Sequence, residues 1–137
     1  MLKISNTDIH LTINPLGAGL LTGKYGVNKR PKQGRLVEEK RYTDRYGDEM
    51  NFAVADRFNA YASEHGMNPS TLAVSWVMSN PAITAPIIGA RNLEQLEYSL
   101  AAIDVEMTPE WRNEISSLSV TPAPATDRGE TLLPTWT

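Results

Sequence analysis

The stretch NPLGAGLLTGKY, residues 14–25, combines glycines with a single lysine in a way that suits an anionic ligand. Gly17, Gly19 and Gly23 allow the chain to turn closely beneath a bound group, and Lys24 supplies a positive charge. Taken alone, the stretch is more often a simple turn after a strand, with an exposed lysine. Both interpretations stay open at this point.

A second stretch, PIIGARNLEQL at residues 86–96, runs from a strand into a helix through Gly89. A helix N-terminus presents unpaired backbone N–H groups, and glycine lets an anion approach the backbone. The Arg91 guanidinium would add a bidentate phosphate contact. The pattern is neither G-x-G-x-x-G nor Walker A, so a tight turn with a solvated arginine is the more common explanation.

Other residue types give no catalytic or metal site. The two histidines, His10 and His65, are far apart, and no H-x-x-x-H pair or paired carboxylate stands out. Residues 26–48 are dominated by charge and predict a long loop, either a lid over an anion or a solvated segment. Its basic residues include Lys29, Arg30, Lys32, Arg35, Lys40 and Arg41.

The surrounding elements alternate between strand and helix. Apolar alternation predicts a strand over residues 9–13, and a short apolar run predicts a buried strand over 83–88. Helical periodicity, with Asn68, Asn92 and Thr108 as N-caps, predicts helices over 48–66, 68–80, 92–103 and 107–118. This order predicts an α/β fold of parallel units, with ligand sites at the carboxyl ends of the strands.

Composition argues against several classes of partner and site. The 137 residues carry a net charge of −3 without a basic face, so nucleic acid is an unexpected partner. The absence of cysteine excludes disulfides and thiolate metal sites. No window approaches the roughly 20 apolar residues of a membrane span. We expect a soluble, cytoplasmic protein without a membrane partner.

Together the motifs NPLGAGLLTGKY, LAVSWVMSNP and PIIGARNLEQLEYSLAAIDVEMTPEWRNEI resemble the C-terminal third of the aldo-keto reductase family, especially bacterial members related to potassium-channel β subunits. The resemblance implies a partial (β/α)8 TIM barrel, contributing its C-terminal β/α units only, over residues 1–119. Residues 120–137 are then an extended tail. It also implies NADP(H) as cofactor and a small aldehyde or ketone as substrate.

The resemblance implies a set of cofactor-binding residues by position. The first group lies along the pyrophosphate and the nicotinamide ribose, and comprises Asn14, Pro15, Leu16, Gly17 and Ala18, with Lys24 toward the phosphates. The second group surrounds the adenosine 2′-phosphate, and comprises Gly89, Ala90, Arg91 and Gln95, with Ser99 able to hydrogen-bond nearby. Arg91 would favour NADP over NAD.

Two departures from the family accompany this resemblance. Tyr98 and Ser99 stand where the family often has a Glu-Asn pair, which predicts weaker adenine contacts. No motif matches the catalytic Asp, Tyr, Lys and His, so the expected function is a truncated reductase that is inactive alone. The alternatives are an interaction module that self-associates, swaps elements or completes a barrel with another chain, and a gene remnant without activity.

Overall fold

The computed structural model describes residues 9–120 and has a mixed α/β fold dominated by helices. Two very short strands, β1 (Leu11–Thr12) and β2 (Ala85–Pro86), pair in parallel with Leu11 opposite Ala85. The order of the elements thus confirms a parallel α/β arrangement. The expected tail at 120–137 lies outside the described residues, apart from Val120.

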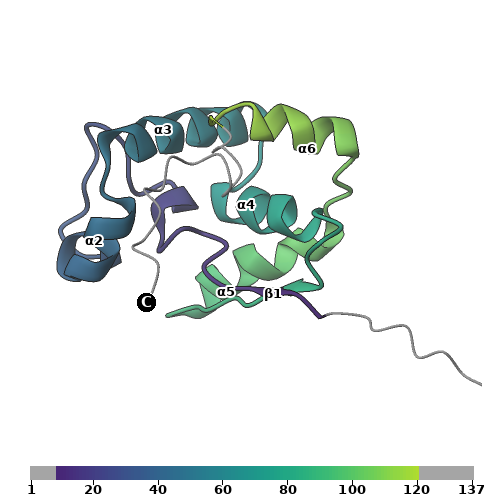
Figure 1. Ribbon diagram of the computed structural model, residues 1–137, viewed down its shortest axis with the longest axis horizontal. Helices are drawn as coiled ribbons and strands as arrows, with labels where there is room; N and C mark the ends of the chain where they lie inside the picture. Colours follow the sequence, from purple (N-terminus) through teal and green to yellow (C-terminus); the bar gives the residue numbers. More distant parts are fainter. Residues whose placement is uncertain (1–8, 121–137) are drawn as a thin grey trace, which may run out of the picture.

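Four longer helices make up most of the helical structure, and the strand pair lies at the edge of the described chain (Figure 1). They are α3 (Glu49–Glu64), α4 (Pro69–Met78), α5 (Leu93–Leu100) and α6 (Pro109–Ser116). Figure 1 shows α3 and α6 along one side, the strands and α5 on the other, and α4 between them. Two 3₁₀ turns lie beside these elements, η1 (Leu20–Thr22) before α3 and η2 (Ala101–Asp104) directly after α5.

Side-chain caps fix where these helices begin. The Asn68 Oδ1 accepts a hydrogen bond from the Ser70 backbone N–H at 2.8 Å, and the Asn92 Oδ1 accepts one from Gln95 at 2.9 Å. The Thr108 Oγ1 likewise accepts from the Trp111 backbone N–H at 3.1 Å. These contacts confirm the three caps expected from the sequence.

The charged segment at 26–48 differs from the expected loop. Its second half forms two short helices, α1 (Arg35–Glu38) and α2 (Lys40–Tyr46). Leu36 is buried in a cluster with Tyr25 and Phe52, and Tyr42 packs against that cluster. A few apolar side chains scattered among charges are therefore enough to fold this segment onto α3.

The strands are shorter than the runs at 9–13 and 83–88 predicted. Pro86 has no N–H, and the Ile87 N–H instead donates to the Thr12 carbonyl at 2.8 Å. Asn14 then leaves the extended region with a φ of 54°. Proline within one strand and a left-handed residue after the other limit the regular pairing.

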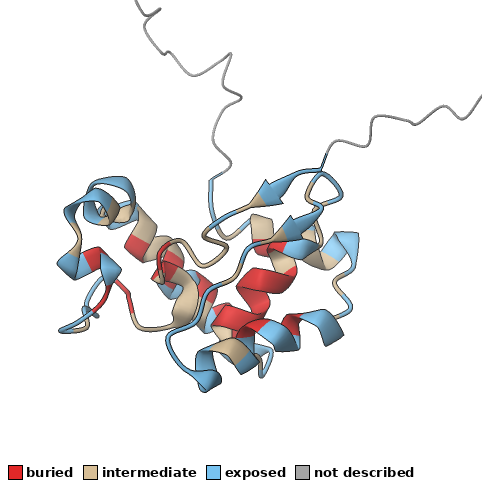
Figure 2. Ribbon diagram, turned by 90° about the horizontal axis from the view of Figure 1, so that it is seen from below, coloured by how far each residue is buried: buried red, intermediate tan, exposed pale blue. Residues whose placement is uncertain are grey.

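The core lies around α4. Leu72, Ala73 and Val74 are buried there, and Leu72 and Ala73 belong to a cluster that contains Phe58 of α3 and Ile115 of α6. Figure 2 shows buried residues concentrated in the helices, whereas the strands are largely exposed. This helical core supports the loops that leave the carboxyl ends of β1 and β2.

Candidate functional site

A cavity of about 490 Å³ opens where the two glycine-containing stretches meet. Its volume lies within the range typical of small-molecule sites. Residues after β1 form one wall, residues after β2 form another, and Asn68 and Ser70 at the start of α4 contribute as well. The carboxyl ends of parallel strands thus bring together two stretches more than sixty residues apart.

Most of the predicted cofactor-binding residues line this cavity. From the first stretch they are Asn14, Pro15, Leu16, Ala18 and Lys24. From the second stretch they are Gly89, Ala90, Arg91 and Gln95. The chain therefore gathers nine of the eleven predicted residues around one space.

Gly17 and Ser99 do not line the cavity. Gly17 has a φ of 56° and its N–H donates to the Asn14 carbonyl at 2.9 Å, so it shapes the turn. Ser99 is only 4% exposed. The geometry gives no support to a direct ligand contact from either side chain.

Left-handed backbone winds the first stretch tightly beneath the cavity. Besides Gly17, the residues Asn14, Ala18, Gly19 and Gly23 have positive φ values between 54° and 94°. Glycine tolerates this region freely, whereas Ala18 at a φ of 58° is an unusual choice. The turn ends with Lys24 at the cavity wall.

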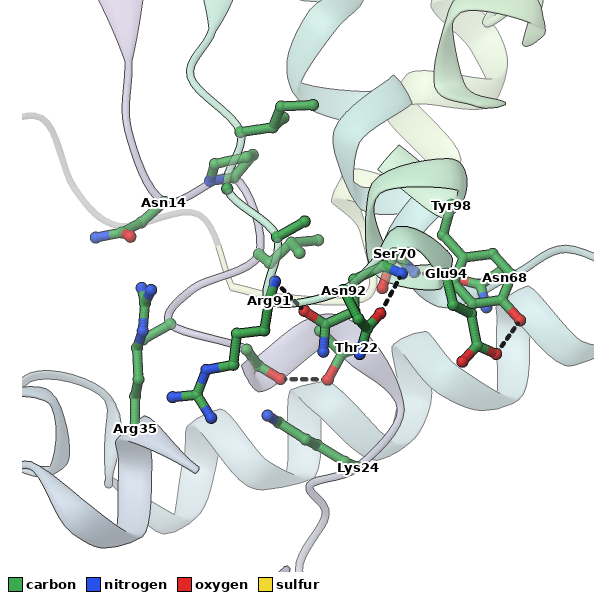
Figure 3. A pocket seen from close by; sticks show the side chains of 18 of the residues that line it. Asn14, Thr22, Lys24, Arg35, Asn68, Ser70, Arg91, Asn92, Glu94 and Tyr98 are labelled. Carbon is green, nitrogen blue, oxygen red and sulfur yellow. Dashed lines mark hydrogen bonds between the residues drawn. The ribbon is translucent and has the colours of Figure 1, made fainter. Parts of the chain in front are cut away.

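Three cations converge on the cavity. Figure 3 shows the Lys24, Arg35 and Arg91 side chains directed toward a common region from three separate segments. Burial lowers the pKa of Lys24, and the positive charges of Arg91 and Arg35 lower it further, against a smaller opposing effect of Glu38. Within residues 9–120, none of the three cations forms an ion pair.

Arg35 was expected only as one of several basic loop residues, and its place in the cavity depends on tertiary contacts. The Leu36 backbone N–H donates to the Tyr25 hydroxyl at 3.3 Å, and Tyr25 is fully buried. The Gly34 N–H donates to the Glu38 carboxylate at 2.9 Å. These bonds hold α1 so that Arg35 borders the cavity.

The second stretch leaves donors available to a ligand. The Arg91 N–H donates to the Gln95 Oε1 at 2.9 Å, which uses the amide oxygen and leaves the Gln95 amide N–H₂ group free in the described part of the chain. Over residues 9–120, the Gly89 and Ala90 N–H groups make no hydrogen bond. A methyl group added at Gly89 would meet no atom within 4 Å. This turn is therefore open to close approach by an anion.

The opposite end of the cavity holds Glu94 and Tyr98 of α5. The Tyr98 hydroxyl donates to the Glu94 Oε1 at 3.0 Å, and this hydrogen bond raises the pKa of Tyr98. The pair gives this end of the cavity a polar, hydrogen-bonded wall.

These features suit a ligand with several negative charges. Three cations that lie close together and form no ion pair in the described residues repel one another, and an anion among them would relieve that repulsion. Free backbone N–H groups add neutral donors for phosphate oxygens. Across the described ranges, no group of three or more His, Asp or Glu residues is placed to hold a metal ion, and no helix is long and apolar enough to cross a membrane.

Comparison with known proteins identifies relatives of this chain. Protein tas of Escherichia coli K12 is 29% identical over 108 residues, which is 79% of this chain and 31% of that protein. A probable voltage-gated potassium channel subunit beta of Oryza sativa subsp. japonica is 32% identical over 111 residues, covering 78% of this chain and 34% of the relative.

L-glyceraldehyde 3-phosphate reductase of Escherichia coli K12 is 32% identical over 98 residues, covering 69% of this chain and 28% of the enzyme. The chain therefore spans about a third of the length of the relatives it matches. Residues 4–120 match the aldo/keto reductase family. The chain belongs to the aldo/keto reductase family.

Proposed function

We propose that this chain supplies part of the NADP(H) site of an aldo-keto reductase and binds the phosphate-bearing portion of the cofactor. The observation that carries the proposal is the convergence of Lys24, Arg35 and Arg91 on one cavity without a carboxylate partner in the described residues. A dinucleotide with a 2′-phosphate carries several negative charges, which matches this set of cations.

Individual roles follow from the position of each group. Arg91 and the Gly89 and Ala90 N–H groups would hold the adenosine 2′-phosphate, with the Gln95 amide as a further donor. Lys24 and Arg35 would hold the pyrophosphate. Asn14, Pro15, Leu16 and Ala18 would line the side toward the nicotinamide ribose, while Gly17 shapes their turn.

The chemistry of the family is hydride transfer between the nicotinamide and a carbonyl carbon, with a protein acid donating a proton to the oxygen. The relative named L-glyceraldehyde 3-phosphate reductase supports aldehydes or ketones as the substrate class. The motifs that carry the resemblance include none of the catalytic Asp, Tyr, Lys and His residues of the family. We therefore propose that the isolated chain binds cofactor without turnover.

We further propose that β1 and β2 are neighbouring strands of a partial (β/α)8 barrel formed by residues 1–119, followed by a tail over 120–137. Their parallel pairing, with helices packed on one side, supports this arrangement. The remaining strands and the catalytic residues would come from additional polypeptide. A cytoplasmic location remains part of the proposal.

A second candidate function, an interaction module, has its own supporting observation. Strand register and alternation place Ile9, Leu11 and Ile13 on the same sheet face as Ile87, and these four side chains are 51–71% exposed. Apolar clusters of this kind mark contact surfaces. A second copy or another chain would cover this face.

Titration with NADPH and NADH tests the first proposal. Cofactor fluorescence should report tighter binding of NADPH, and the same sample should show no oxidation of NADPH by an aldehyde above a protein-free control. A folded chain that binds neither dinucleotide would contradict the cofactor proposal. Aldehyde-dependent NADPH oxidation would contradict the proposed inactivity alone.

Light scattering tests the second candidate function independently of the first. The interaction module requires a dimer or larger species that Ile9→Ser with Ile13→Ser converts to monomer, because these changes make the exposed face polar. A strictly monomeric chain would exclude self-association. Neither result alters the expected preference for NADPH.

A further inference from the structure

Lys24 is the only lysine among the described residues that line the cavity. Its side chain passes between two glycines, since a methyl group added at Gly19 or Gly34 would lie 3.4 or 3.5 Å from the Nζ atom. In the described part of the chain this amine forms no ion pair, whereas the Lys29 amine donates to the Gly23 carbonyl at 2.7 Å. The Lys24 nitrogen is therefore available to a reactive group in the cavity.

The surroundings of Lys24 favour the neutral amine, which is the nucleophilic form. Burial lowers the pKa of Lys24, and the Arg91 and Arg35 guanidiniums lower it further. The Glu38 carboxylate opposes them with a smaller effect, and the Tyr25 ring lies 5.4 Å from the amine. Burial beside cationic groups is how proteins prepare a lysine to condense with a carbonyl. Because burial is the largest cause, the lowering should persist when a bound anion offsets the two guanidinium charges.

The same surroundings select which carbonyl compound reaches the amine. Figure 3 shows the Arg35 and Arg91 guanidiniums and the Lys24 amine directed toward one region of the cavity. Guanidiniums bind phosphate through paired N–H donors, so they would hold a phosphorylated molecule with another part of it beside the amine. Holding two reacting groups together strongly raises the rate of their reaction. An aldehyde that carries a phosphate is the kind of ligand that engages all three side chains.

We propose that Lys24 is a covalent capture site for phosphorylated aldehydes, with Arg35 and Arg91 binding the phosphate while the amine forms an imine. The neutral amine adds to the carbonyl carbon to give a carbinolamine, which then loses water. A C=N bond replaces the C=O bond, and the carbonyl oxygen leaves in that water with two protons from the nitrogen. The step needs no oxidant or reductant, and hydrolysis reverses it.

This inference goes beyond cofactor binding, because it gives the cavity a covalent chemistry of its own. Imine formation and dinucleotide binding are then mutually exclusive, since both use the same three cations. A phosphorylated aldehyde would accordingly compete with NADPH for the cavity.

Labelling with pyridoxal 5′-phosphate tests the proposal on the native chain. The probe should form an imine, seen as a shift in its visible absorbance, which borohydride reduction makes permanent and peptide mass spectrometry assigns to Lys24. At limiting probe, modification of Lys24 should exceed that of Lys32 and Lys40 at least about tenfold, because these two exposed lysines do not line the cavity.

Two further arms test the role of the phosphate. Inorganic pyrophosphate at about ten times its dissociation constant should reduce modification of Lys24 about tenfold by competition and leave that of Lys40 unchanged. Arg91→Ala should slow modification of Lys24 about tenfold, the lower end of a charge-assisted contact. Arg45→Ala removes an exposed arginine that does not line the cavity, and it should leave the rate within about twofold of the native chain.

Lys24→Arg separates covalent capture from charge. Arginine keeps the positive charge but is not a nucleophilic amine, so the imine absorbance should fall to the level given by the surface lysines, while pyrophosphate still binds. Lys40→Arg is the matched control and should keep the full absorbance. Thermal unfolding of both variants in the same buffer verifies that they are folded. Unchanged imine absorbance in Lys24→Arg would overturn the capture site.

The contrary results on the native chain bear on different claims. Equal modification of all the described lysines, or modification of Lys24 that pyrophosphate does not reduce, would overturn the capture site. Capture at Lys24 by a chain that does not bind NADPH would support the capture site and contradict the cofactor proposal. NADPH binding without imine formation at Lys24 would do the reverse. A folded chain that shows neither would overturn both proposals.

Discussion

Replacing Arg91 with alanine should reduce the affinity for NADPH by about tenfold and leave the affinity for NADH nearly unchanged. A charge-assisted hydrogen bond contributes about 1.5–3 kcal/mol, and an exposed side chain belongs at the lower end of that range. Arg91 is exposed, so about 1.4 kcal/mol, a factor of about ten, is the expected loss. NADH lacks the 2′-phosphate that Arg91 is proposed to hold.

The structure indicates that this substitution leaves the fold intact. The contact of Arg91 with Gln95 uses the backbone N–H, which alanine keeps. Arg45→Ala provides a matched control, because Arg45 is an exposed arginine of α2 that does not line the cavity. The assay is parallel calorimetric titration of both variants with NADPH and NADH at one ionic strength.

Equal loss of affinity for NADPH and NADH in Arg91→Ala would refute the assignment of Arg91 to the 2′-phosphate. An effect of the same size in Arg45→Ala would show that overall charge, rather than the cavity, governs binding. An unchanged NADPH affinity in Arg91→Ala would remove Arg91 from the site altogether.

The remaining predictions concern four individual residues, Lys24, Gly34, Gly89 and Ser99. Because burial and neighbouring cations lower the pKa of Lys24, NADPH affinity should fall with rising pH before 10.5 is reached, and a titration of Lys24→Met should lose that alkaline step. The same shift means that the folded state holds this proton less tightly than the unfolded state, so the Lys24 contribution to stability should increase as pH rises through the lowered pKa toward 10.5. Gly34→Ala should lower the free energy of unfolding by about 1–3 kcal/mol in a urea titration, since φ is 147° and the added methyl group would collide with the Tyr25 hydroxyl. Gly89→Ala should leave stability almost unchanged, so any loss of NADPH affinity would report close approach of the ligand; unaltered affinity would contradict that approach. Ser99→Ala should bind NADPH as the native chain does, and a clear loss would restore Ser99 to the site that its burial argues against.

The helices were predictable because their signals are local. Asn68 followed by Pro69, and Thr108 followed by Pro109, mark helix starts by chemistry confined to adjacent residues. The apolar face around Leu72 follows the helical period. Structure that depends on a few neighbours along the chain can be read from sequence.

The fold of the charged segment and the position of Arg35 could not be predicted, because both depend on contacts between residues far apart in the sequence. The segment containing α1 shows no apolar periodicity, and Leu36 becomes part of the core only through Tyr25 and Phe52. Arg35 reaches the cavity as a consequence of that packing. No local pattern distinguishes it from the other basic residues nearby.

Side-chain direction on α5 explains why Ser99, a predicted cofactor-binding residue, does not line the cavity. Gln95 and Tyr98 are three residues apart and face the cavity together, whereas Ser99 is one position further round the helix and is buried. The leucine spacing and the Asn92 cap located the helix correctly. They did not show that Tyr98 would line the cavity while Ser99 would be buried.

Backbone amide chemical shifts of the labelled chain, followed during titration with NADPH, test the central claim most directly. Saturable shifts should appear at residues that border the cavity, with little change on α6; these residues are Gly19, Lys24, Gly89, Ala90 and Arg91. Shifts confined to the exposed sheet face around Leu11, or no saturable shifts in a folded sample, would contradict the claim that these two stretches hold the cofactor.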